Sequence, residues 1–187
     1  MKYIVIFASG SGSNAQKIVE YFSKSEIARV VMIYSNRADA YVLQRAYKLN
    51  IPSVVFDKVD FHETDLILNQ LNQLQPDLIV LAGFLWKIPE KIVHAFPKKI
   101  VNIHPALLPK YGGKGMYGDR VHRAVIENCE KESGITIHYV NENYDEGAFI
   151  LQAKIEIDDD ETPETLANKV HELEHKYYPS IIEQILI

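Results

Sequence analysis

Two polar side chains, Asn102 and His104, stand at the end of a short apolar run that is followed by Pro105 and Pro109. Residues two apart on a strand project from the same face, so the amide and the imidazole are expected side by side. Proline donates no ladder hydrogen bond, so Pro105 ends the strand, and ligands of open α/β sheets bind at the carboxyl ends of strands. An amide that holds an oxyanion beside an imidazole that delivers a proton suits acyl transfer.

A third candidate group is Asp145, which lies in a turn between two later apolar runs. An aspartate at such a position commonly serves only the turn itself. If it lies beside His104, its negative charge favours the imidazolium and raises the pKa of the histidine, as a general acid near neutral pH requires. The pattern leaves both interpretations open.

The segment that follows the first apolar run is rich in glycine and serine and reads Ser9-Gly10-Ser11-Gly12-Ser13-Asn14-Ala15. Glycine permits a tight turn and a close approach of the backbone to a ligand. The start of the next helix presents free N–H groups and the positive end of its dipole to an anion. Together with the side-chain donors of Ser11, Ser13 and Asn14, this favours a phosphate site for a small molecule.

Two other interpretations of this turn stay open, a dinucleotide site and a purely structural turn. The spacing also satisfies G-x-G-x-x-A, but dinucleotide sites use an acidic residue at the end of the second strand. There the chain reads Tyr34-Ser35-Asn36-Arg37, which holds no carboxylate. A nucleotide-binding P-loop is excluded, because no Gly-Lys-Ser/Thr follows the glycines.

Near the end of the chain, residues 171–175 match the zinc motif H-E-x-x-H, which places His171 and His175 on one face of a helix. Only three residues of the motif are fixed, so chance matches are frequent. No third histidine follows, and Glu183 is only a nominal third ligand. We interpret the segment as a solvated or ligand-facing helix edge and expect no bound metal.

Apolar runs alternate with amphipathic stretches over the first hundred residues. Strands are expected at residues 3–8, 29–34, 54–56, 78–81 and 100–103, and helices at 13–23, 38–49, 61–74 and 90–95. Continuous apolar strands separated by helices indicate a parallel sheet that is covered on both faces. The sequence therefore predicts an α/β fold with a Rossmann-like, doubly wound sheet.

The order changes beyond residue 104. A helix is expected at 119–128, followed by strands at 135–140 and 149–157 whose connection is too short for a crossover helix. This strand pair is therefore expected to be antiparallel, near the C-terminal end of a mostly parallel sheet. A last helix at 163–187 begins with Thr162 as N-cap and Pro163 at the first helical position.

The composition predicts one globular domain, residues 1–187, because 47% of the 187 residues are hydrophobic. With 25 acidic and 20 basic residues the net charge is −5, which argues against a nucleic-acid partner. The single Cys129 excludes an internal disulfide. No apolar run is long enough for a membrane span and the first residues lack a signal-peptide pattern. We expect a cytoplasmic protein without membrane partners, as monomer or homodimer.

Together these motifs resemble those of the glycinamide ribonucleotide formyltransferases, the folate-dependent enzymes of purine synthesis. The resemblance covers essentially the whole chain. It rests most on Asn102-Ile103-His104-Pro105-Ala106-Leu107-Leu108-Pro109 and on the turn at residues 10–14. Other matching segments are residues 35–40, 81–85, 145–147, 150–152 and 174–179.

The resemblance implies that small-molecule substrates meet in one cleft, where the formyl group of the co-substrate 10-formyltetrahydrofolate passes to the amine of glycinamide ribonucleotide. The transfer is a direct attack through a tetrahedral intermediate, with Asn102, His104 and Asp145 as catalytic residues. The residues implied for the ribonucleotide are Gly12, Ser13, Asn14 and Glu174. Those implied for the folate are Leu85, Trp86, Lys87, Ile88, Asn102, Asn141, Glu142, Asn143, Tyr144 and Asp145.

The chain departs from the family pattern in three places. Leu85-Trp86 stands where the family often has Met-Arg, an arginine expected near His62 is missing, and the loop at residues 112–118 is longer and richer in glycine. Two other functions remain as alternatives. Formyltransferases acting on methionyl-tRNA or an amino sugar generally carry a further domain. A non-catalytic nucleotide-binding module would keep the glycine turn without needing Asn102 beside His104.

Overall fold

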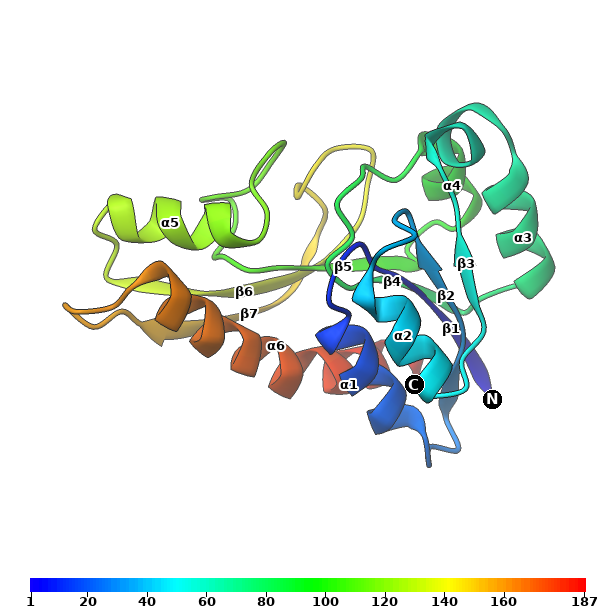
Figure 1. Cartoon of the computed structure of the whole chain (residues 1–187), viewed down its shortest axis with the longest axis horizontal. Helices are drawn as coiled ribbons and strands as arrows, with labels where there is room; N and C mark the ends of the chain where they lie inside the picture. The colour runs from blue at the N-terminus through cyan, green and yellow to red at the C-terminus, as the bar shows by residue number, and fades with distance from the viewer.

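The computed structural model describes residues 1–187, and its centre is a seven-stranded sheet (Figure 1). The strands are β1 (Lys2–Phe7), β2 (Ala28–Ser35), β3 (Ser53–Val55), β4 (Leu78–Leu81), β5 (Ile100–His104), β6 (Glu132–Tyr139) and β7 (Phe149–Glu156). Their order across the sheet is β3-β2-β1-β4-β5-β6-β7. The first five pair in parallel, whereas β6 is antiparallel to both of its neighbours. The predicted α/β fold, with a mostly parallel sheet and an antiparallel pair late in the chain, is confirmed.

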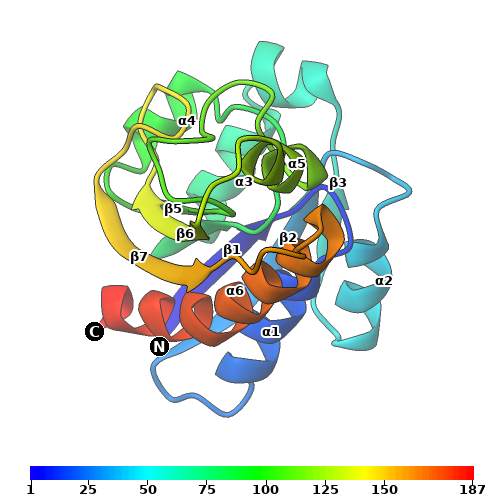
Figure 2. The same cartoon turned by 90° about the vertical axis from the view of Figure 1, so that its left-hand side faces the viewer.

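Successive residues of a strand point to opposite sides of the sheet, so a continuous apolar strand presents hydrophobic side chains on both faces. Helices cover both faces and bury these side chains. Ile4 and Ile6 of β1 share one core cluster with α1, α2, α5 and α6, whereas Val5 and Phe7 share a second cluster with α3 and α4. Figure 2 shows α1 and α6 on one side of the sheet and α3 and α4 on the other. The helices are α1 (Ser13–Phe22), α2 (Tyr41–Lys48), α3 (Leu66–Leu74), α4 (Glu90–Ala95), α5 (Asp119–Glu127) and α6 (Pro163–Leu186).

One expected helix is interrupted. The pattern predicts a continuous helix over residues 61–74, but the chain forms a single π-helical element, η1 (Val59–Glu63), and then α3. Between them Thr64 has an extended backbone, and its Oγ1 accepts a hydrogen bond from the N–H of Leu66 at 3.3 Å. This local bond competes with the helical ladder, so the continuous helix was a wrong prediction.

Two boundaries also differ from the prediction. Helix α2 begins only at Tyr41, since Ala40 is extended and its N–H donates to the carbonyl of Arg37. Strand β6 begins at Glu132, three residues before the expected start, because its pairing with β7 reaches Glu156. The alternation of apolar residues locates the middle of an element, whereas pairing and capping decide its ends.

Helix α6 is anchored to the end of β4 and to the start of β5. It begins as predicted, with Thr162 accepting a hydrogen bond from the N–H of Thr165 and Pro163 at the first position. Further along, the buried hydroxyl of Tyr178 lies 3.0 and 3.2 Å from the carbonyls of Leu81 and Val101, and its single hydrogen is shared between them. None of the helices combines the length and the apolar character that crossing a bilayer requires.

Candidate active site

A cavity of about 590 Å³ opens at the carboxyl ends of β1, β4 and β5. The glycine turn after β1, the segment after β4 and the end of β5 form three of its walls, and the loops before α5 and after β6 form the others. Residues of α6 also reach it. The position at the strand ends is the one expected for a ligand site in this class of sheet.

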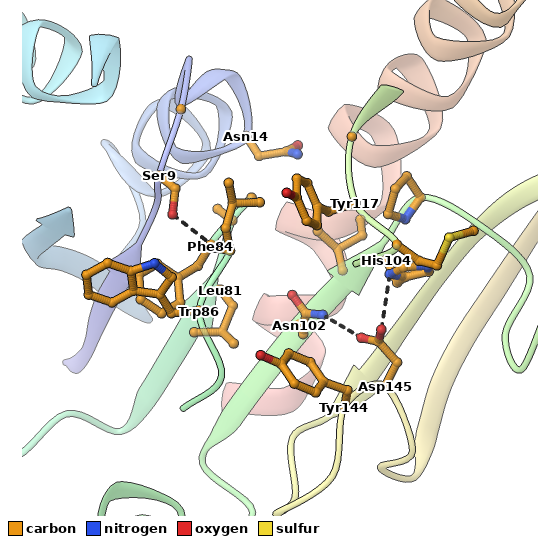
Figure 3. A pocket seen from close by; sticks show the side chains of 18 of the residues that line it. Ser9, Asn14, Leu81, Phe84, Trp86, Asn102, His104, Tyr117, Tyr144 and Asp145 are labelled. Atoms are coloured by element: carbon orange, nitrogen blue, oxygen red, sulfur yellow. Dashed lines mark hydrogen bonds and ion pairs between the residues drawn. The ribbon is translucent and has the colours of Figure 1, made fainter. Parts of the chain in front are cut away.

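Asn102, His104 and Asp145 converge in this cavity (Figure 3). The Nδ1 atom of His104 lies 3.6 Å from Oδ2 of Asp145, and Nδ2 of Asn102 lies 3.5 Å from its Oδ1. Strand β5 supplies the amide and the imidazole from one face, as their spacing predicts. Asp145 comes from the β6–β7 connection, so the structure resolves the open question of its position in favour of proximity.

Asp145 is held in place by the loop that precedes α5. Its φ of 54° lies in the left-handed region, which aspartate tolerates better than most residues. The N–H of Gly113 donates to Oδ2 at 2.9 Å. Burial raises the pKa of this carboxyl, but hydrogen bonding to His138, the charge of His104 and the Gly113 N–H together lower it below its ordinary value. The carboxylate is therefore ionised at neutral pH.

The imidazole of His104 is almost enclosed, with 4% of the residue exposed. Its Nε2 donates to the carbonyl of Tyr111 at 2.7 Å, so the neutral ring carries its hydrogen there and turns the lone pair of Nδ1 towards Asp145. Burial lowers the pKa of His104 by more than Asp145 and the Tyr111 carbonyl raise it. The expected raised pKa is thus wrong for the free protein, because the loss of hydration outweighs the nearby carboxylate.

His138, a residue that the sequence analysis missed, fixes the amide of Asn102. The register of β5 and β6 places the two residues opposite each other. The Nδ1–H of His138 donates to the carbonyl of Tyr139 at 2.9 Å, and its Nε2 lies 3.2 Å from Nδ2 of Asn102 and 3.6 Å from Oδ1 of Asp145. The nitrogen of the amide therefore faces His138 and Asp145, and Figure 3 shows its oxygen on the side away from Asp145.

The glycine turn is locked by its neighbours in α2. Gly12 has a φ of 74°, and a Cβ built there would lie 2.4 Å from Cγ2 of Val42, so only glycine fits. The N–H of Val42 donates to the carbonyl of Gly10, and Nε of Arg45 donates to the carbonyl of Ser11. Hydrogen bonds to α2 thus hold the carbonyls of Gly10 and Ser11. The start of α1 lines the cavity, and its free N–H groups can bind an anion there.

The side chains of Asn14 and Glu174 join this turn to α6. Both residues line the cavity, as do Gly12 and Ser13, and Nδ2 of Asn14 donates to Oε2 of Glu174 at 2.8 Å. The Oδ1 atom of Asn14 is buried without a partner. Burial raises the pKa of Glu174 in spite of the hydrogen bond from Asn14. The pair offers unpaired acceptors to the hydroxyl or amine donors of a ligand.

The residues assigned to the folate line the same cavity as the glycine turn, and Glu142 is the one exception. Those that line it are Leu85, Trp86, Lys87, Ile88, Asn141, Asn143 and Tyr144. Glu142 does not, and its carboxylate pairs with His94 at 3.0 Å. At two of the three places where the chain departs from the family pattern, the rings of Trp86 and His62 lie 6.1 Å apart, and Nζ of Lys58 lies 5.8 Å from the Trp86 ring.

The H-E-x-x-H segment lies on α6 beside the cavity. The rings of His171 and His175 stack with centroids 6.4 Å apart, and both His171 and Glu174 line the cavity. The structure brings together no group of three or more His, Cys, Asp or Glu side chains arranged to hold a metal ion. The segment therefore lies partly along the wall of the cavity, and its role as a ligand-facing helix edge stays a prediction.

Comparison with known proteins shows where the chain belongs. The family profile described as "Formyl transferase" matches residues 2–182. The phosphoribosylglycinamide formyltransferase of Bacillus subtilis is 38% identical over 100% of this chain and 95% of its own length. The chain belongs to the phosphoribosylglycinamide formyltransferase family. This confirms the resemblance drawn from the motifs.

Two further relatives support the assignment. The chloroplastic phosphoribosylglycinamide formyltransferase of Arabidopsis thaliana is 41% identical over 98% of this chain, which spans 65% of that protein's length. The crystal structure of glycinamide ribonucleotide transformylase 1 from Geobacillus kaustophilus superposes with a TM-score of 0.91, covering 100% of both chains at 36% identity. The fold and the family are therefore shared with enzymes of known structure.

Proposed function

We propose that this protein transfers the formyl group of 10-formyltetrahydrofolate to the amine of glycinamide ribonucleotide. The observation that carries the proposal is the convergence of Asn102, His104 and Asp145 in one cavity that also receives the glycine turn after β1. The names of the relatives support the reaction and the acceptor. The folate donor and the roles of single residues rest on chemistry and on the family resemblance.

The cavity accommodates the two substrates from opposite ends. The phosphate of the ribonucleotide binds at the turn formed by Gly12, Ser13 and Asn14, where helix α1 presents its N–H groups. Glu174 accepts hydrogen bonds from the ribose hydroxyls. The folate lies along the segment from Leu85 to Ile88 and against the loop at residues 141–145, which brings its formyl group to Asn102 and His104.

The neutral amine attacks the formyl carbon, forming a C–N bond and moving the carbonyl electron pair onto oxygen. The oxyanion is stabilised by Nδ2–H of Asn102, whose contact with Asp145 at 3.5 Å is too long to compete strongly. His104, neutral in the free protein, accepts a proton from the attacking nitrogen on Nδ1, which faces Asp145. The imidazolium is stabilised by Asp145 and by the Tyr111 carbonyl.

Collapse of the tetrahedral intermediate restores the carbonyl and breaks its bond to the folate nitrogen. The His104 imidazolium then acts as general acid and donates its proton to that leaving nitrogen. One proton thus moves from one nitrogen to the other, and no covalent bond to the enzyme forms. Holding both substrates in one cavity makes the attack effectively unimolecular. The cytoplasmic location and the monomeric or homodimeric state stay predictions.

The test is to mix the protein with glycinamide ribonucleotide and 10-formyltetrahydrofolate. Formylated ribonucleotide should appear by mass spectrometry at the rate at which tetrahydrofolate forms by absorbance. Omission of the ribonucleotide is the control, since it separates transfer from hydrolysis of the donor. Tetrahydrofolate without formylated ribonucleotide, or no reaction at all, would overturn the proposal.

A further inference from the structure

The mechanism above leaves one buried, titratable side chain of the cavity unused. His122 lies in the first half of α5, is 3% exposed and lines the cavity. Its Nδ1 atom is enclosed by the protein and has no hydrogen-bond partner. A buried polar atom without a partner is unusual, and in a ligand cavity it marks a place where the ligand supplies the missing bond.

The ring shares the cavity with Glu174, which is assigned to the ribose, and with His104. His171, whose Nε2 lies 3.9 Å from Oε2 of Glu174, and His104 both lie close enough that their charges lower the pKa of His122. Asp119, in the same helix, acts in the opposite direction. His122 therefore lies within reach of the charges of both histidines, of which His171 is next to the carboxylate assigned to the ribose and His104 belongs to the proposed catalytic set.

The charge state of the ring limits what it can bind. Burial, the largest cause, together with the neighbouring histidines lowers the pKa of His122 to about 4, so the ring is neutral at neutral pH. A neutral imidazole carries one N–H donor and one acceptor nitrogen. It is a poor site for a phosphate or a carboxylate and a good one for an uncharged group that both donates and accepts.

The acceptor substrate has one such group in the right place. Between its ribose and its amine lies the amide of glycinamide, with one N–H and one carbonyl oxygen. We propose that His122 binds this amide and so selects glycinamide ribonucleotides over other ribose phosphates. The inference rests on the proposed function, because it takes the acceptor and its orientation from there.

The test compares two probes, one with the whole glycinamide group and one without it. Glycinamide ribonucleotide carries the amide, whereas ribose 5-phosphate lacks it. Calorimetry would measure the binding of both to the wild type, to His122→Phe, which keeps a ring without polar atoms, and to His122→Gln, which keeps an uncharged donor and acceptor. Arg123→Ala is the control on the same helix, since Arg123 is exposed and does not line the cavity.

His122→Phe should bind glycinamide ribonucleotide about tenfold more weakly, as expected for the loss of one uncharged hydrogen bond. Its affinity for ribose 5-phosphate should not change, and His122→Gln should recover most of the loss. If both probes weaken alike, or if the glutamine variant binds no better than the phenylalanine variant, the inference is wrong. His122→Leu serves for the same comparison if His122→Phe does not fold.

The outcome is separable from that of the proposed function. A wild-type protein that binds the ribonucleotide but transfers no formyl group would overturn the proposed reaction, and the calorimetric comparison would still decide the role of His122. Conversely, an active wild type with an unaltered His122→Phe affinity would overturn this inference alone.

Discussion

The substitution Gly12→Ala tests whether the turn after β1 holds the ribonucleotide phosphate. The new Cβ would lie 2.4, 2.6 and 2.9 Å from Cγ2, Cβ and Cα of Val42, and the last of these is backbone. The left-handed φ of 74° adds about 1–2 kcal/mol of strain for an L-residue. Overpacking against Val42 adds about 1–3 kcal/mol, so the turn and the start of α2 must move apart.

A displaced turn loses N–H bonds to an anion, each worth about 1.5–3 kcal/mol, which corresponds to a loss of about 10- to 100-fold in affinity. Calorimetry should show this loss for glycinamide ribonucleotide and an unchanged affinity for 10-formyltetrahydrofolate. Gly10→Ala is the matched control, because nothing lies within 4 Å of a Cβ at that position and its φ is not left-handed. The reasoning is refuted if the folate affinity falls instead, or if both alanine variants lose equally.

Three further substitutions test charge, titration and packing. Asp145→Asn keeps a residue that tolerates the left-handed backbone but removes the charge beside His104. Turnover should therefore fall by about 10²-fold or more. Steady-state kinetics would measure the loss, and an unchanged melting temperature would show that the variant is folded. The pKa of His122 is about 4 in the folded chain against 6.5 ordinarily, so the neutral ring stabilises the fold above pH 6.5 and this is lost as the pH falls towards 4. Urea unfolding at pH 7 and pH 4.5 should therefore show His122→Phe losing about 2–3 kcal/mol less than the wild type over this interval, and an equal loss would contradict the assignment. Tyr178→Phe removes the buried hydroxyl that faces the carbonyls of Leu81 and Val101. The free energy of unfolding should fall by about 1–2 kcal/mol and the melting temperature by about 3–6 °C. An unchanged melting temperature would show that this hydroxyl contributes nothing to stability.

The sequence predicts the fold where local pattern is sufficient. Apolar runs such as Leu78–Leu81 are recognisable strands because a strand buried on both faces needs continuous hydrophobic residues. The start of α6 is equally readable from Thr162 and Pro163. The break before α3 was not predicted, since a side-chain bond of Thr64 decides it and the apolar periodicity continues across it.

The candidate site shows the same division. Asn102 and His104 are two residues apart on one strand, so their juxtaposition follows from the period of a strand. His138 was missed because its contact with Asn102 depends on the register of β5 and β6, which the sequence does not encode locally. His122 was missed because burial, rather than any motif, distinguishes it. The direction of the His104 pKa was wrong because burial is a property of the folded chain.

The most direct test of the central claim compares single-turnover formyl transfer by the wild type, Asn102→Ala and His104→Ala, with both substrates saturating. Removing an oxyanion donor such as Asn102 typically lowers turnover by about 10²–10³-fold, and removing a general acid–base such as His104 by about 10²–10⁴-fold, so each variant should lose at least about 10²-fold while it stays folded. The controls are Asn128→Ala and His94→Ala, which remove the same groups from exposed positions that do not line the cavity and should leave turnover unchanged. Wild-type turnover in either Asn102→Ala or His104→Ala would contradict the account.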